Sequence, residues 1–273
     1  MTYEQPTSGR AATARPDAQP GAPAGGSPTP VPRGQAIWDN VKGLAWVILI
    51  FLLVRTVLIE AYRIPSGSMK PTLQIGDWLF VNKLVYGPHV PFTHANLPGY
   101  RTPARGDIIV FESPYQADEA ARGEDPTPTL VKRTVGLGGD TLYMHDGVVY
   151  VNGAPAPTTH LMPNPHGGDY QSQAFAWMNG YTVTGTRFGA PNNGHAQPSL
   201  DNWGPIVVPA GHLFMMGDNR YDSKDSRYWG FVPRANVRGQ PLFVYYSYNA
   251  EDSDRPLPGL TDIRWSRIGH VIR

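Results

Sequence analysis

The sequence contains no cysteine among its 273 residues. This absence excludes disulfide bonds, zinc sites built on thiolates and a cysteine nucleophile. Charged residues are also scarce, because they make up 16% of the chain where about a quarter is usual. Lysine and arginine number 23 against 22 acidic residues, so no broad basic surface for nucleic acid is indicated. The sequence shows no HExxH motif, carboxylate cluster or nucleotide-binding loop, and we expect neither a metal nor a cofactor.

Glycine and proline are plentiful, with 30 and 28 residues. Both residue types favour turns. The chain is also long enough for one or two domains and for a hydrophobic core that needs no covalent staples. We therefore expect a turn-rich β structure together with a segment that does not fold.

The N-terminal part divides into two segments of opposite composition. Residues 1–36 are dominated by Pro, Ala, Gly, Ser and Thr, which predicts a disordered tail. An unbroken apolar run of eleven residues then extends from Leu44 to Val54. Taken over residues 37–60, this segment is long enough to cross a bilayer as a helix. We interpret it as a transmembrane anchor, with residues 1–36 as a cytoplasmic tail.

Two other interpretations of the apolar run are a buried helix of a globular domain and a cleaved signal peptide. A helix in a two-sided core would be expected to carry a polar face, which this run lacks. A signal peptide would be expected near the N-terminus and would end in a small-x-small cleavage site. The flanking charges do not decide the orientation, because Arg33 and Lys42 before the run nearly balance Arg63 and Lys70 after it.

Short strands between turns are indicated from residue 61 onward. The segments 141–145 and 148–152 flank Asp146 and Gly147, a pair typical of a type I′ hairpin. Further strands are predicted by β-branched and aromatic residues at 78–84, 107–111, 130–135, 212–216 and 242–246. The predicted fold class is mostly β, with an antiparallel catalytic core of two sheets and an inserted smaller β/loop domain behind one N-terminal transmembrane helix.

The domain boundaries follow from composition. Residues 153–204 are rich in Gly, Pro and Asn and are predicted to form the inserted subdomain. The core then consists of residues 61–152 and 205–273.

Three segments could carry chemistry. The first is the run from Ile64 to Leu73, in which Ser66 and Ser68 flank a glycine between two prolines. The second contains Lys132 next to Arg133 on a predicted strand, where alternation directs the two side chains to opposite faces. Lowering a lysine pKa from about 10.4 to about 8 needs roughly 3 kcal/mol of preference for the neutral amine, and burial can supply it. Each taken alone, these two segments favour a rigid turn and a strand-edge lysine that reaches into water.

The third segment extends from Gly217 to Pro233 and alternates acidic and basic residues. It could form a solvated loop or a hydrogen-bonded scaffold beneath a site. No GxSxG elbow is present, and no histidine lies in a recognisable triad motif.

These segments together resemble the bacterial type I signal peptidases, a serine/lysine dyad family also called leader peptidases. The resemblance is carried in order by IPSGSMKPTL, RGDIIVF, VKRTVGLGGD and GDNRYDSKDSRYWGFVP, and by the C-terminal RWSRIGHVIR. It covers about residues 37–152 and 205–273 and leaves the tail and the insertion unmatched.

The resemblance implies a role for each matching residue. Ser68 corresponds to the nucleophile and Lys132 to the general base, while Ser66 and the backbone N–H of Ser68 correspond to the oxyanion hole. Ser223 corresponds to the serine that orients the lysine amine. The remaining matches are supporting residues (Asp218, Asp225 and Arg227) and residues of shallow apolar substrate pockets (Ile64, Met69, Leu79 and Val131), although strand core is nearly as good an interpretation of Leu79.

The function implied is a membrane-anchored serine endopeptidase that removes signal peptides from exported preproteins after small-x-small sites. Its partners would be preproteins and the lipid bilayer, and no nucleic acid. The family resemblance also implies a bacterial plasma membrane location with the N-terminus in the cytoplasm and the catalytic domain on the outer face. Two alternatives are a self-cleaving Ser/Lys protease of related fold, which would need a DNA-binding domain that residues 1–60 do not offer, and a non-catalytic anchored β protein of envelope assembly.

Overall fold

The structure is a computed structural model that describes residues 33–89, 97–163, 168–183 and 197–273. The chain divides into two compact units, Met1–Val47 and Ile48–Arg273. Every described strand lies in the second unit, so the candidate chemistry of residues 64–73, 132 and 217–233 belongs to one folded body.

The first element is helix α1 (Arg33–Val57). It begins four residues before the predicted anchor, so residues 33–36 are helical and the predicted tail is wrong there; residues 1–32 lie outside the described residues. It also ends before residue 60, because Ile59 already pairs with Asn82 in a β ladder. No proline interrupts Arg33–Val57, which allows the helix to be continuous.

Apolar side chains of α1 are exposed from Trp38 to Val54, which argues against the interpretation as a buried globular helix. In the part of the chain that the structure describes, no helix combines the length and the apolar character needed to cross a membrane.

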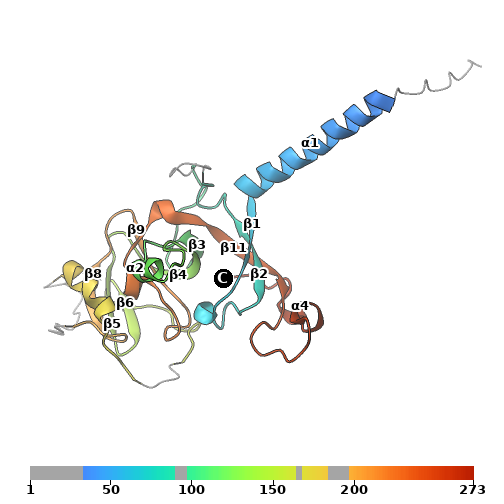
Figure 1. The fold of residues 1–273 in the computed structure, drawn as a ribbon. Coiled ribbons are helices and arrows are strands. Elements are labelled where there is room, and N and C mark those ends of the chain that lie inside the picture. Colours follow the sequence, from blue (N-terminus) through green and yellow to red (C-terminus); the bar gives the residue numbers. More distant parts are fainter. Residues whose placement is uncertain (1–32, 90–96, 164–167, 184–196) are drawn as a thin grey trace, which may run out of the picture. The chain divides into compact units, whose positions relative to one another are not determined.

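Two antiparallel sheets form the second unit, as predicted. The larger has seven strands in the order β1-β2-β11-β3-β4-β9-β10. Their bounds are β1 (Ile59–Arg63), β2 (Asp77–Asn82), β3 (Ile108–Glu112), β4 (Thr129–Leu137), β9 (His212–Met216), β10 (Val232–Pro233) and β11 (Val237–Ser247). Figure 1 shows the long strand β11 running between β2 and β3, where it joins the two parts of this sheet.

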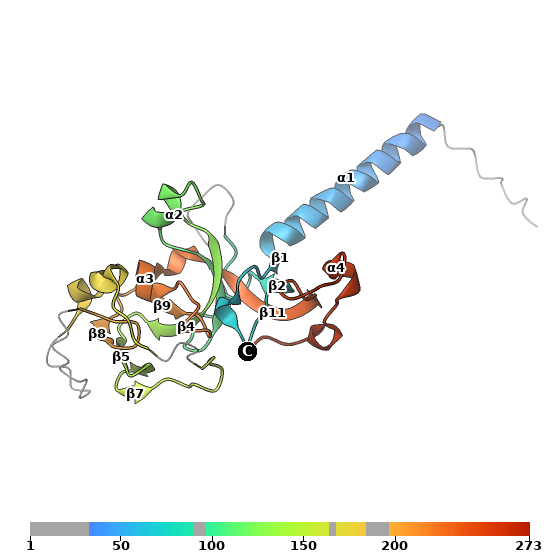
Figure 2. The ribbon, with the colours of Figure 1, turned by 60° about the horizontal axis from the view of Figure 1, so that its bottom comes forward.

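The smaller sheet has the strand order β7-β6-β5-β8, with β5 (Thr141–His145), β6 (Val148–Val151), β7 (Ala154–Pro155) and β8 (Trp203–Val207). Asp146 and Gly147 both have positive φ, 48° and 77°, which confirms the predicted type I′ hairpin. Both ribbon views place β5 and β8 at the end of the molecule away from β1 and β2 (Figure 1, Figure 2).

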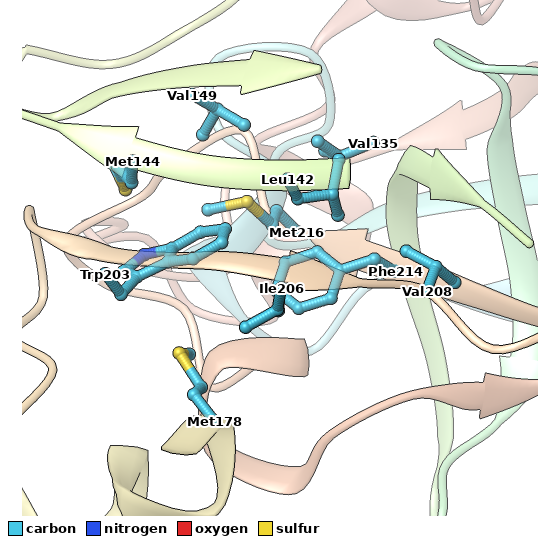
Figure 3. Packing of buried hydrophobic residues seen from close by; sticks show 10 residues of the cluster. All are labelled: Val135, Leu142, Met144, Val149, Met178, Trp203, Ile206, Val208, Phe214 and Met216. Carbon is cyan, nitrogen blue, oxygen red and sulfur yellow. The ribbon is translucent and has the colours of Figure 1, made fainter. Parts of the chain in front are cut away.

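The sheets do not follow the predicted boundary at residue 152. The hairpin β5–β6, assigned to the core, pairs with β8 beyond the insertion, so the smaller sheet is built from both sides of residues 153–204. Ten buried side chains from β4, the smaller sheet, β9 and the insertion form one cluster (Figure 3). Hydrophobic contact across residues far apart in sequence explains why composition alone misplaced this boundary.

The insertion packs against the core through the 3₁₀ segment η2 (Gln173–Tyr181). Phe175 and Met178 are buried there, and Met178 belongs to the cluster of Figure 3. Trp177 donates a hydrogen bond from Nε1 to the carbonyl oxygen of Arg227 at 2.9 Å. Residues 164–167 and 184–196 of the predicted subdomain lie outside the described residues.

The other described elements are short: α2 (Ala117–Ala121), α3 (Ser226–Trp229), α4 (Pro258–Thr261) and the 3₁₀ turns η1 (Gly67–Met69), η3 (Arg234–Asn236) and η4 (Trp265–Arg267). Helical structure is therefore scarce after α1, as predicted.

Candidate active site

The serine-containing run forms the 3₁₀ turn η1 in the connection between β1 and β2. Ser68 is buried, and its carbonyl oxygen accepts a hydrogen bond from the backbone N–H of Asn219 at 3.0 Å. The side-chain amide of Asn219 donates to the carbonyl oxygen of Gly67 at 3.3 Å. The 217–220 segment, about 150 residues away in sequence, therefore fixes the backbone of the candidate nucleophile through these hydrogen bonds.

Lys132 lies on β4, and its Nζ donates a hydrogen bond to Ser68 Oγ at 2.5 Å. The structure thus brings together two residues that are 64 positions apart. Burial lowers the pKa of Lys132 to about 8, against the opposing effect of the Asp225 carboxylate. Because burial penalises the charged amine, a substantial fraction of Lys132 is neutral at slightly alkaline pH and can accept a proton.

Arg133 points to the other side of β4, as strand alternation predicts. Its Nε and one terminal nitrogen donate to the two Asp218 oxygens at 2.8 and 2.7 Å. Thr72 Oγ1 also donates to Asp218, at 2.6 Å. Asp218 thereby connects β4 to the residues that follow η1, and Arg133 and Thr72 are site residues that sequence reasoning missed. The adjacency of Arg133 to Lys132 was the available signal.

A second buried ion pair joins Asp225 and Arg227, both 0% exposed. Burial alone would raise the pKa of Asp225, but the charge and hydrogen bonds of Arg227 hold this pKa below its ordinary value. Asp225 also accepts a hydrogen bond from the backbone N–H of Gly217 at 3.1 Å. The predicted supporting residues thus take part in two buried ion pairs, Asp218 with Arg133 and Asp225 with Arg227.

Gly217 is a further residue that sequence reasoning did not single out. A Cβ at this position would lie 2.3 Å from Ser223 Oγ and 2.4 Å from the carbonyl oxygen of Ser68. Only glycine permits this close approach. Its place at the start of the GDN sequence was the only signal.

Ser66 and Ser223 lie near the dyad with different hydrogen bonding. Ser66 Oγ is 3.5 Å from Ser68 Oγ. Ser223 Oγ is buried and has no hydrogen-bond partner among the described residues. The bond from Ser223 to Lys132 that the sequence prediction requires is thus not made in this structure, in which the amine donates to Ser68.

Two adjoining cavities open on these groups. The larger, of about 580 Å³, is lined by Ser66, Ser68, Lys132 and Ser223 among others. The smaller, of about 60 Å³, is lined by Ile64, Met69 and Val131 next to Ser68 and Lys132. Leu79, in contrast, is fully buried in a core cluster with Ile64 and Met69 and does not line the smaller cavity. The core interpretation of Leu79 therefore holds, since its strand position faces inward.

The arrangement places a depressed-pKa amine against a serine hydroxyl at the floor of a cleft. Such a pair can activate the hydroxyl for attack on a carbonyl group. Among the described residues, no group of three or more histidine, aspartate or glutamate side chains could hold a metal ion.

Comparison with known proteins gives consistent matches. The family model described as "Signal peptidase, peptidase S26" matches residues 37–246. A signal peptidase I from Pseudomonas fluorescens is 36% identical over 82% of this chain and 76% of that protein. A signal peptidase I from Aquifex aeolicus is 32% identical over 76% of this chain and 84% of that protein. A crystal structure of a signal peptidase I from Enterococcus faecalis is 29% identical, covers 51% of this chain and 97% of that chain, and has a TM-score of 0.30.

Proposed function

We propose, from the premise that the chain belongs to the signal peptidase family S26, that it cleaves signal peptides from preproteins with Ser68 as nucleophile and Lys132 as general base. The observation that carries this proposal is the 2.5 Å hydrogen bond between Lys132 Nζ and Ser68 Oγ. It is supported by the lowered pKa of Lys132, about 8, because a base must be deprotonated near the working pH.

In the first step, Ser68 Oγ attacks the carbonyl carbon of the scissile peptide bond while the neutral Lys132 amine takes the hydroxyl proton. The carbonyl oxygen becomes an oxyanion, which accepts hydrogen bonds from the backbone N–H of Ser68 and the hydroxyl of Ser66. One such preorganised donor is worth about 3 kcal/mol in the transition state. The position of Ser66 Oγ, 3.5 Å from Ser68 Oγ, supports this role.

The tetrahedral intermediate then collapses as the Lys132 ammonium gives its proton to the leaving amine. The C–N bond breaks, the mature protein departs and the signal peptide remains as an ester on Ser68. Lys132 next takes a proton from a water molecule, whose oxygen attacks the ester carbon. The bond from that carbon to Ser68 Oγ then breaks, Lys132 returns the proton to Ser68 Oγ, and the signal peptide leaves with a free carboxyl group. Ser223 has no competing partner among the described residues, so its hydroxyl can hold the amine once Ser68 has reacted.

Specificity for small residues before the cut is supported by the size of the smaller cavity, for the substrate side chain that enters it. Its 60 Å³ is about the volume of two water molecules. Methyl-sized side chains fit against Ile64, Met69 and Val131, whereas a leucine or phenylalanine side chain would need the core to move.

The proposal includes attachment to a membrane through residues 37–60, with the N-terminus in the cytoplasm and the catalytic unit on the outer face. The exposed apolar side chains of α1 support it, since a run of this kind is unfavourable in water. Flotation of the full chain with lipid vesicles tests the attachment, and recovery of the protein away from the vesicles would contradict it.

The test of the dyad is cleavage of a preprotein ending in Ala-x-Ala by the full chain in detergent, compared with Ser68→Ala and Lys132→Ala. Both variants should lose cleavage and retain the circular dichroism spectrum of the wild type. Ser253→Ala and Lys83→Ala are matched controls elsewhere in the fold, and both should retain cleavage. A folded wild type that leaves the substrate intact would favour the non-catalytic anchored β protein instead.

A further inference from the structure

A separate cavity of about 330 Å³ lies on the Arg133 side of β4. Arg133, Thr134 and Val135, which are consecutive on that strand, line it, whereas Lys132 lines the cavities of the dyad. The described residues around it also include Arg105, Arg220 and His160. The cavity is thus distinct from the cleft at Ser68.

Two of its three arginines are neutralised by carboxylates. Arg105 forms an ion pair with Asp140. Arg133 forms one with Asp218, and its terminal nitrogens also lie 3.4 and 3.5 Å from the carbonyl oxygen of Arg273. These two cations therefore have little capacity left for a ligand.

Arg220 differs from both. It is 3% exposed, and its Nε donates to the carbonyl oxygen of Gly217 at 3.0 Å. Within the described residues, no carboxylate forms an ion pair with it and neither terminal nitrogen has a protein acceptor. Burial and the neighbouring Arg227 lower the pKa of Arg220 to about 10, so the guanidinium stays charged at neutral pH.

His160 also lines the cavity. Its Nε2 is buried and lies 3.7 Å from Asp218 Oδ1, so it faces that carboxylate and is closed to a ligand. Burial and then the charge of Arg133 lower the pKa of His160. Arg220 is therefore the lining cation, among the described residues, with donors left for an anionic ligand, and unmatched buried donors are costly.

The rest of the wall is apolar. Val135, Val151, Ala154 and Pro155 line the cavity, and Val135 also belongs to the core cluster of Figure 3. Apolar walls with a few convergent polar groups are typical of small-molecule sites, and 330 Å³ is at the lower end of their size range.

We propose that this cavity binds a small organic monocarboxylate, whose carboxylate accepts hydrogen bonds from the terminal nitrogens of Arg220 while its apolar body packs against Val135 and Val151. A planar guanidinium recognises a carboxylate through two parallel hydrogen bonds. Binding here does not depend on the proposed peptidase activity, so either proposal can fail alone.

Benzoate is the probe, and the neutral benzamide of similar shape is its control. Titration of the full chain in detergent, followed by ligand-detected NMR, should show saturable binding of benzoate with a dissociation constant of about 1 mM or tighter. Benzamide and inorganic phosphate should bind at least tenfold more weakly, since one lacks the charge and the other the apolar body.

Two variants test the location. Arg220→Gln removes the charge, and Ala154→Trp fills the cavity while keeping Arg220; each should weaken benzoate binding at least tenfold. Arg234→Gln, an exposed arginine outside the cavity, should leave it unchanged. Full affinity in a folded Ala154→Trp or Arg220→Gln protein would overturn the proposal, as would equal binding of benzamide. Phosphate binding as tightly as benzoate would overturn the assignment to an organic carboxylate.

Discussion

The two sides of strand β4 differ in whether the buried cation of each side is paired with a carboxylate. On one side Lys132 is buried against Ser68 and no described carboxylate forms an ion pair with it. On the other side Arg133 is held by both oxygens of Asp218. Burial without a paired charge favours a neutral amine, whereas burial with a carboxylate favours the cation. One strand thus carries an amine hydrogen-bonded to Ser68 on one side and a structural ion pair on the other.

Replacing the amine by a permanent cation should have the largest effect. Lys132→Arg places a group that stays protonated next to Ser68, so no base remains to activate the hydroxyl. We expect kcat/KM for an Ala-x-Ala preprotein to fall about 10³-fold or more. Retention of a tenth of the wild-type value by the folded variant would show that Lys132 is not the base.

Breaking the ion pair on the other side should act on stability first. Asp218→Ala leaves the buried Arg133 guanidinium without its carboxylate, and removal of one partner of a buried pair typically costs about 3–5 kcal/mol. Urea unfolding monitored by circular dichroism measures this loss. Exposed Asp254→Ala is the matched control and should change the free energy of unfolding by less than about 0.5 kcal/mol. If Asp218→Ala also lowered the free energy of unfolding by less than this amount, the ion pair on the Arg133 side of β4 would not be structural.

The pH dependence of kcat/KM tests whether Lys132 is the base. Because Lys132 must be neutral and its pKa is about 8, kcat/KM should rise tenfold per pH unit below that value and level off above it. A profile that is flat from pH 6 to 9 would be inconsistent with this base.

The same pKa has a consequence for stability. The folded pKa of Lys132, about 8, is below the ordinary 10.5, so between these values the unfolded chain binds more protons. The free energy of unfolding therefore increases as the pH rises through this window. Below pH 8 the buried amine is charged, and its burial then lowers the free energy of unfolding by roughly 3 kcal/mol at most. Lys132→Met should accordingly be more stable than the wild type at pH 7, with a difference that shrinks toward pH 10. Urea unfolding at both pH values measures it, and an equal difference at both would contradict the assigned pKa.

The smallest effect is expected at Ser223. Its hydroxyl makes no hydrogen bond among the described residues, so Ser223→Ala should change the free energy of unfolding by less than about 1 kcal/mol. If the hydroxyl holds the amine during the reaction, kcat should still fall several-fold with KM unchanged. No change in kcat would show that Lys132 needs no orienting serine.

Prediction from sequence succeeded where the pattern is local. The hairpin at Asp146–Gly147 follows from two residues that accept positive φ, and β9 follows from a short apolar run bounded by turns. Prediction failed where distant segments pack together. The pairing of β5 with β8 and the burial of Met178 against both sheets depend on contacts that no local pattern encodes.

The candidate site divides in the same way. The opposite directions of Lys132 and Arg133 follow from strand alternation alone, and resemblance to a family named Ser68 and Lys132 as a pair. Neither indicated that Asp218 pairs with Arg133 or that Gly217 touches Ser68, and neither decided between pocket and core for Leu79. These depend on how η1, β4 and the 217–227 segment pack together.

The sequence by itself determined the residue types, the alternation along β4 and the family to which the chain belongs. Only the tertiary structure decided the electrostatics, because a pKa depends on burial and on the charges within a few ångströms. Lys132 is a base candidate because folding brings Ser68 to its amine and leaves nearby carboxylates to Arg133 and Arg227. Arg220, from the same acidic and basic segment, forms no ion pair with any described residue and lines a separate cavity.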